Sequence, residues 1–178
     1  MADRWLTGVL LVGGASTRFG SPKALALLDG ETLADRAWRL LGETCDERLA
    51  VGKASDGLEL PFPVLDDGTE VRAALAGIVA GLRAAVHDVT VVLPVDVPSM
   101  TPAGLRRLAD ACLDAAVTPP GPLPGAYRKT ALPALERALG EGRLAIREAL
   151  TGLDTAVVEL DAALLVNVNT ADDLRRLG

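Results

Sequence analysis

Short runs of apolar residues recur along the chain, separated by segments in which apolar positions repeat every three or four residues. Such runs are typical of buried strands, and the longer repeat is typical of helices that pack one face on a core. The alternation predicts an α/β fold of three layers, Rossmann-like, with a mainly parallel sheet between helices. Strands are expected at 7–12, 48–51, 63–65, 89–95, 115–118, 156–160 and 164–168.

Helical segments are expected between these runs. One apolar face consists of Leu33, Ala37, Leu40 and Leu41, and a second of Val71, Leu75, Ile78, Val79 and Leu82. Thr101 before a proline is typical of a helix N-cap and first turn, and Thr170 with Asp173 has the spacing of a capping box. Shorter helices are expected at 131–139 and 144–150.

Length and composition narrow the class of protein. A chain of 178 residues that is 49% hydrophobic can bury one full core, so a single domain over 1–178 is expected. A net charge of −6 and an aromatic content of 3% oppose binding to nucleic acid or to anionic membranes. No apolar stretch is long enough to span a membrane, and two cysteines without metal or redox spacing favour the reducing cytoplasm.

The strongest local signal is the loop that follows the first apolar run. It carries glycines and hydroxyl residues together with two cations, Arg18 and Lys23. Glycines let backbone N–H groups approach an anion closely, and the cations bind phosphate oxygens, so the loop favours a phosphate ligand. The spacing fits neither a P-loop nor the dinucleotide fingerprint Gly-x-Gly-x-x-Gly. A tight turn without any ligand is the alternative.

The loop resembles the signature of nucleotidyltransferases of the molybdenum cofactor guanylyltransferase type, Leu-Ala-Gly-Gly-x-Ser-x-Arg-Met/Phe-Gly-x-x-Lys. The matching residues are Leu11, Gly13, Gly14, Ser16, Arg18, Phe19, Gly20 and Lys23. Val12 departs from the pattern, where Ala is usual. The resemblance implies that the nucleotide is bound by Leu11, Gly13, Gly14, Ala15, Ser16 and Lys23. It also implies that Arg18 and Lys23 act in catalysis by neutralising the transferred and leaving phosphates.

Asp96 directly follows the most continuous apolar run, at the kind of strand end where open α/β sheets place ligand groups. Mg²⁺ is commonly held by one or two carboxylates together with phosphate oxygens, so Asp96 is the candidate metal ligand and a catalytic residue. A turn or capping aspartate is the alternative. The segment resembles the family's Cys-Asp-x-Pro, with Val95 in place of Cys.

Two further matches are weaker. Asn167 and Asn169 lie two residues apart, which would place them on one face of a strand, and the segment resembles the family's Asn-x-Asn-Thr-Pro-Glu-Asp-Leu. Either could bind the metal or a substrate oxygen, although a plain helix entrance is the alternative. Asp66 or Asp67 matches the Asp that precedes the family's Gly-Pro-Leu-x-Gly, unless both are ordinary turn residues. Ala-Ala at 73–74 replaces Gly-Pro, which bears on base selection.

The resemblance covers the chain from Leu11 to Leu174 and implies a nucleotidyltransferase type of fold. It implies Mg²⁺-dependent transfer of GMP from GTP to molybdopterin, with release of pyrophosphate and contacts with cofactor-delivery or acceptor proteins. By position, the 118–129 segment, including Tyr127 and Arg128, is expected to border the acceptor. The alternatives are a CTP-dependent molybdopterin cytidylyltransferase, a catalytically silent nucleotide-binding carrier with this fold, or a protein-interaction domain.

Overall fold

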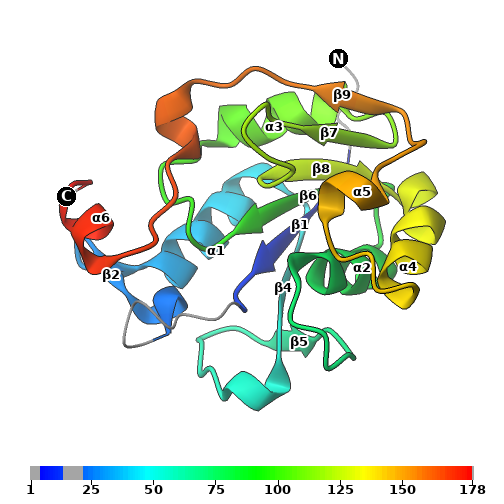
Figure 1. Ribbon diagram of the computed structural model, residues 1–178. Helices are drawn as coiled ribbons and strands as arrows, with labels where there is room; N and C mark the ends of the chain where they lie inside the picture. Colours follow the sequence, from blue (N-terminus) through cyan, green and yellow to red (C-terminus); the bar gives the residue numbers. More distant parts are fainter. Residues whose placement is uncertain (1–4, 14–21, 178) are drawn as a thin grey trace.

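A seven-stranded sheet forms the centre of the molecule in the computed structural model, which describes residues 5–13 and 22–177 (Figure 1). The strands are β1 (Leu6–Leu11), β4 (Glu47–Gly52), β5 (Val64–Asp66), β6 (Val89–Pro94), β7 (Ala115–Val117), β8 (Gly125–Arg128) and β9 (Thr155–Val157). Their order across the sheet is β5-β4-β1-β6-β8-β7-β9. Strands β5, β4, β1 and β6 are parallel, β8 runs antiparallel to both β6 and β7, and β9 is parallel to β7. The predicted α/β fold with a mainly parallel sheet is confirmed.

Helices cover both faces of this sheet (Figure 1). They are α1 (Leu33–Thr44), α2 (Ala74–Ala84), α3 (Pro102–Ala111), α4 (Leu132–Gly140), α5 (Ile146–Ala149) and α6 (Ala171–Arg175). Helices α1 and α3 pack in one apolar cluster with one face of the sheet, whereas α2, α4 and α5 pack in a second cluster on the other face. Within the described ranges, no helix combines the length and the apolar character that crossing a membrane requires.

Short elements complete the chain. A hairpin of β2 (Leu27–Leu28) and β3 (Glu31–Thr32) precedes α1. The described residues also form the 3₁₀ helices η1 (Lys23–Leu25), η2 (Ala54–Asp56), η3 (Lys129–Ala131) and η4 (Ala162–Leu165).

The helix starts follow from local chemistry. The hydroxyl of Thr101 accepts a hydrogen bond from the N–H of Gly104, and a proline occupies the first turn of α3, as predicted. Thr170 and Asp173 form the predicted capping box at the start of α6.

Helix α2 lies so close to β1 that a Cβ atom built on Gly77 would come within 2.7 Å of the Leu11 side chain. The glycine therefore sets the distance between helix and sheet.

The prediction of a strand at 164–168 is wrong. Its first two residues end the 3₁₀ helix η4, and the remainder has no sheet partner. Leu164 and Leu165 instead pack on the apolar cluster around α3, which gives the segment a strand-like apolar pattern without a strand's hydrogen bonds. Conversely, β8 was not predicted, because its four residues directly follow a proline-rich loop.

Candidate functional site

A cavity of about 500 Å³ opens at the end of the sheet where β1, β4 and β6 terminate. Apolar residues from these strands and from α2 form part of its wall. The charged and amide side chains that line it are Lys23, Lys53, Asp67, Arg72, Asp96 and Asn167. Carboxyl ends of parallel strands are the usual ligand-binding edge of an open α/β sheet, so this cavity is the candidate site.

Lys23 and Asp96 meet in this cavity. The ammonium of Lys23 lies 3.1 Å from Asp96 Oδ2, and it also donates a hydrogen bond of 3.3 Å to Asn169 Oδ1. Lys23 is the first residue of η1, and Asp96 follows β6 by two residues. The side chains remain partly exposed, at 18% and 26%. A cation and a carboxylate thus stand together where a charged ligand can reach both.

The glycine-rich loop leaves the sheet at the same place. Leu11 is the last residue of β1, and both Leu11 and Gly13 line the cavity. Gly14, Ala15, Ser16 and Arg18 lie outside the described residues. The loop therefore begins at one wall of the cavity, and Lys23, which follows it, reaches Asp96.

The segment with the two asparagines reaches the site without forming a strand. The N–H of Val168 donates to the carbonyl of Asp96 at 2.8 Å, which holds the segment against the end of β6. Val168 is buried, while Asn167 and Asn169 are exposed on either side of it. Asn167 lines the cavity, and Asn169 contacts Lys23. Both amides are thus near Asp96, although the predicted strand pairing is absent.

At the other end of the cavity a second ion pair is almost fully buried. The ammonium of Lys53 lies 2.7 Å from Asp67 Oδ1, and the two side chains are 9% and 6% exposed. Lys53 also donates to the carbonyl of Thr69, and the N–H of Thr69 donates to Asp67 Oδ1. Sequence reasoning missed Lys53. It lies just beyond β4, a position after a parallel strand like that of Asp96, and this could have marked it.

Asp66, the last residue of β5, and Asp67, which follows it, have different surroundings. Asp67 lines the cavity, whereas Asp66 does not. The carboxylate of Asp66 accepts the N–H groups of Ala54 at 2.6 Å and Gly68 at 2.7 Å. These two donors hold the pKa of Asp66 below its usual range. Asp66 therefore joins the loops after β4 and β5, and of the two only Asp67 faces the cavity.

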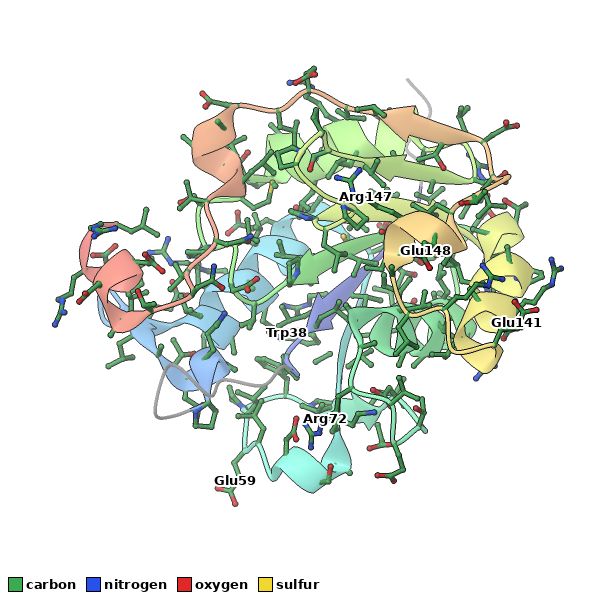
Figure 2. All side chains as sticks on the ribbon, in the orientation of Figure 1. Trp38, Glu59, Arg72, Glu141, Arg147 and Glu148 are labelled. Carbon is green, nitrogen blue, oxygen red and sulfur yellow. The ribbon has the colours of Figure 1, made fainter. Side chains whose placement is uncertain are left out.

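The start of α2 forms the neighbouring wall. Ala73 and Ala74, which replace the family's Gly-Pro, both line the cavity, and Ala73 provides no side-chain cap. Arg72 lies beside them near β5 and donates to Asp56 Oδ1 at 2.9 Å (Figure 2). The lining of the cavity therefore includes a guanidinium that the sequence analysis did not single out.

Neither Tyr127 nor Arg128, both expected to border the acceptor, lines the cavity. Tyr127 is fully buried, and its hydroxyl donates to the carbonyl of Pro122. Arg128 pairs with Asp88 at 2.8 Å, at the opposite end of β6, because β8 runs antiparallel to β6. From this region it is Leu123 that lines the cavity.

Comparisons with known proteins identify the family of this chain. Residues 8–157 match the MobA-like NTP transferase domain family. A probable molybdenum cofactor guanylyltransferase from Chloroflexus aggregans is 32% identical over 96% of this chain and 92% of its own. Molybdopterin-guanine dinucleotide biosynthesis protein A from Archaeoglobus fulgidus has a similar crystal structure, with a TM-score of 0.80, 26% identity and 96% coverage of each chain.

The same fold occurs in a protein whose name indicates transfer of a cytidylyl group. The structure of 2-C-methyl-D-erythritol 4-phosphate cytidylyltransferase from Thermus thermophilus has a TM-score of 0.75 at 20% identity, over 95% of each chain. This likeness concerns the fold alone. The match over 8–157 and the 32% identical relative decide the family. The chain belongs to the MobA-like NTP transferase domain family and is a nucleotidyltransferase.

Proposed function

We propose that this chain transfers GMP from GTP to the phosphate of molybdopterin, with Mg²⁺ as cofactor and pyrophosphate as the second product. The names of the similar proteins from Chloroflexus aggregans and Archaeoglobus fulgidus support this substrate pair. The single structural observation that carries the proposal is the pairing of Lys23 with Asp96 beside the start of the glycine-rich loop. One polyphosphate can contact both groups and the loop.

The donor set near Asp96 fits Mg²⁺. The ion prefers hard oxygen ligands, and it usually combines one or two carboxylates with phosphate oxygens and waters. Asp96 supplies the carboxylate, and the amides of Asn167 and Asn169 supply further oxygens close by. When bound, Mg²⁺ neutralises charge on the phosphates of the nucleotide.

The proposed reaction is a direct displacement. A phosphate oxygen of the acceptor attacks the α-phosphorus of GTP in line, a new P–O bond forms, and the bond to the bridging oxygen of the β-phosphate breaks. Pyrophosphate carries away the negative charge that develops on that oxygen. Lys23 has a flexible stem, so its ammonium can turn from Asp96 to this oxygen and stabilise the charge there. Arg18 is proposed to act on the same phosphates.

The base is proposed to lie at the end of the cavity with Lys53 and Asp67. Guanine presents acceptors at O6 and N7 and donors at N1 and N2, which suit an ammonium and a carboxylate respectively. Adenine would place an amino group where guanine has O6, opposite the ammonium. Ala73 and Ala74 at the start of α2 also line the cavity. CTP is the competing nucleotide to test.

The decisive experiment measures pyrophosphate release from GTP, CTP, ATP and UTP with Mg²⁺ and molybdopterin. We expect release with GTP and its loss in Asp96→Asn, with an unchanged melting temperature. Asp88→Asn is a matched control, because Asp88 also forms an ion pair but lies at the opposite end of β6. Near-normal turnover in Asp96→Asn would remove Asp96 from the metal site. Nucleotide-dependent thermal stabilisation without pyrophosphate release would identify a silent carrier, and faster release with CTP would identify a cytidylyltransferase.

A further inference from the structure

The loop at 118–124, which joins β7 to β8, reaches the candidate site through one side chain. Leu123 lines the cavity and is half-buried. Part of it packs against the apolar cluster that contains α2 and α4. The loop thus contributes an apolar surface beside the polar groups Asp96 and Asn167.

The order of the strands separates the two ends of the cavity. Lys53 and Asp67 follow β4 and β5, on one side of β1. Asp96 follows β6 on the other side, and Leu123 lies still farther along, just before β8. Asp96 therefore stands between the Lys53–Asp67 pair and Leu123.

This order leaves one place for the second substrate if the proposed function holds. A nucleotide with its base at Lys53–Asp67 and its phosphates at Asp96 fills the β4 side of the cavity. The acceptor phosphate must approach the α-phosphorus from a free side, because an in-line displacement needs the attacking and leaving oxygens on opposite sides. We propose that Leu123 is a specificity-determining residue that packs on the ring system of the acceptor, with Asn167 beside it.

The chemistry of this wall suits a flat heterocycle that carries a phosphate. An aliphatic side chain covers the face of a ring by van der Waals contact, while an amide can both donate to and accept from polar atoms at the ring edge. Leu123 and Asn167, which both line the cavity together with Asp96, provide these two kinds of contact. A highly polar acceptor such as a sugar phosphate would gain little from the leucine.

The loop is held in place before any substrate arrives. The buried hydroxyl of Tyr127 donates to the carbonyl of Pro122 at 2.6 Å, next to Leu123. Arg147 reaches from α5 and donates to the carbonyls of Pro119 and Pro120 (Figure 2). A Cβ atom on Gly125 would approach the Pro122 carbonyl to 2.5 Å, so only glycine permits this close turn. Tyr127 is thus a positioning residue for Leu123, because a fixed wall binds its ligand at a lower entropic cost.

The test compares Leu123→Ala with Leu139→Ala in steady-state kinetics. Leu139 packs half-buried against the same apolar cluster but does not line the cavity, so the control matches the loss of packing. We expect Leu123→Ala to raise the KM for molybdopterin on the order of 10-fold, since a missing apolar contact in a pocket has effects of that size. The KM for GTP should stay within about twofold, and Leu123→Met should restore most of the acceptor affinity. Tyr127→Phe should give a smaller change in the same direction.

Several results would overturn the inference. It is wrong if Leu123→Ala raises the KM for GTP instead, or if Leu139→Ala has the same effect on the acceptor. A fluorescence titration of molybdopterin against the protein with bound non-hydrolysable GTP tests acceptor binding without turnover. Wild-type protein that binds molybdopterin but releases no pyrophosphate would contradict the proposed function. The titration would then still test whether the acceptor binds at Leu123. Equal molybdopterin affinity in wild type and Leu123→Ala would contradict the placement itself.

Discussion

Two lysine–aspartate pairs lie in one cavity, and their surroundings differ. Lys53 and Asp67 are 9% and 6% exposed, are 2.7 Å apart, and make further hydrogen bonds to Thr69. Lys23 and Asp96 are 18% and 26% exposed and are 3.1 Å apart, and Lys23 also donates to the exposed Asn169. The same two residue types are thus a fixed part of the wall at one end and an accessible pair at the other.

The difference teaches that burial decides what an ion pair can do. A buried pair with satisfied hydrogen bonds cannot lose one partner without leaving an uncompensated charge away from water. A partly exposed pair contributes little to stability, and either member can exchange its partner for a ligand at low cost. Lys53–Asp67 is therefore suited to present fixed polar groups to the proposed base, and Lys23–Asp96 to bind the charges of phosphates that arrive and leave.

The largest effect is expected when the buried pair is broken. Lys53→Met should lower the free energy of unfolding by roughly 3–5 kcal/mol, because it leaves the Asp67 carboxylate buried without its counter-ion. Urea denaturation measures this loss. The double variant Lys53→Met/Asp67→Leu should recover most of it, since no charge then remains buried. Lys129→Met, at an exposed lysine, is the control and should leave stability unchanged within about 0.5 kcal/mol. Equal stability of Lys53→Met and wild type would show that the Lys53–Asp67 pair, like the Lys23–Asp96 pair, contributes little to stability.

Breaking the accessible pair should lower activity strongly and stability only slightly. Lys23→Ala is expected to lower kcat/KM for GTP about 10²-fold or more, as removal of a group that stabilises charge in the transition state does. Its free energy of unfolding should change by at most about 1 kcal/mol, because the pair is partly exposed. Kinetics of pyrophosphate release and urea denaturation on the same sample measure both quantities. Wild-type kcat/KM would remove Lys23 from the phosphate site, and a large loss of stability would show that its pair is structural.

The sequence predicted the parts of the site that lie on continuous patterns. The segments that form β1 and β6 are almost wholly buried, so both faces of each strand are mainly apolar, and Asp96 follows the end of β6 by two residues. The capping residues Thr101 and Thr170 were identified from spacing alone, because a cap depends on neighbours within three residues. Where a structural feature depends on contacts between neighbouring residues, the sequence is sufficient to predict it.

The parts that the sequence did not predict depend on distant partners. Lys53 is a single lysine after a strand, and its significance comes from Asp67, which follows 14 residues later. Adjacent acids cannot be distinguished by residue type, so only the fold shows that Asp67 faces the cavity and Asp66 does not. Leu123 reaches the cavity because β8 pairs antiparallel with β6, a pairing that its four residues do not reveal.

The smallest effect concerns Asp66, the exposed neighbour of the buried pair. The N–H groups of Ala54 and Gly68 keep the pKa of Asp66 in the folded protein below the unfolded value of about 3.9. The ionised carboxylate therefore stabilises the fold above that value, and this contribution is lost as pH falls through the folded pKa. Asp66→Asn should lower the melting temperature at pH 7 only slightly, because the amide oxygen can still accept a hydrogen bond.

The difference in melting temperature between wild type and Asp66→Asn should shrink as pH falls from 5 toward 3. Asp114 and Asp173, whose pKa values are also lowered by hydrogen bonds, titrate in both proteins and cancel in this difference. Differential scanning calorimetry at several pH values measures it. A difference that stays constant would mean that the hydrogen bonds act without the charge. A difference that shrinks would show that Asp66 stabilises the fold through its ionised carboxylate at the surface. Asp67, in contrast, acts through its ion pair with the buried Lys53.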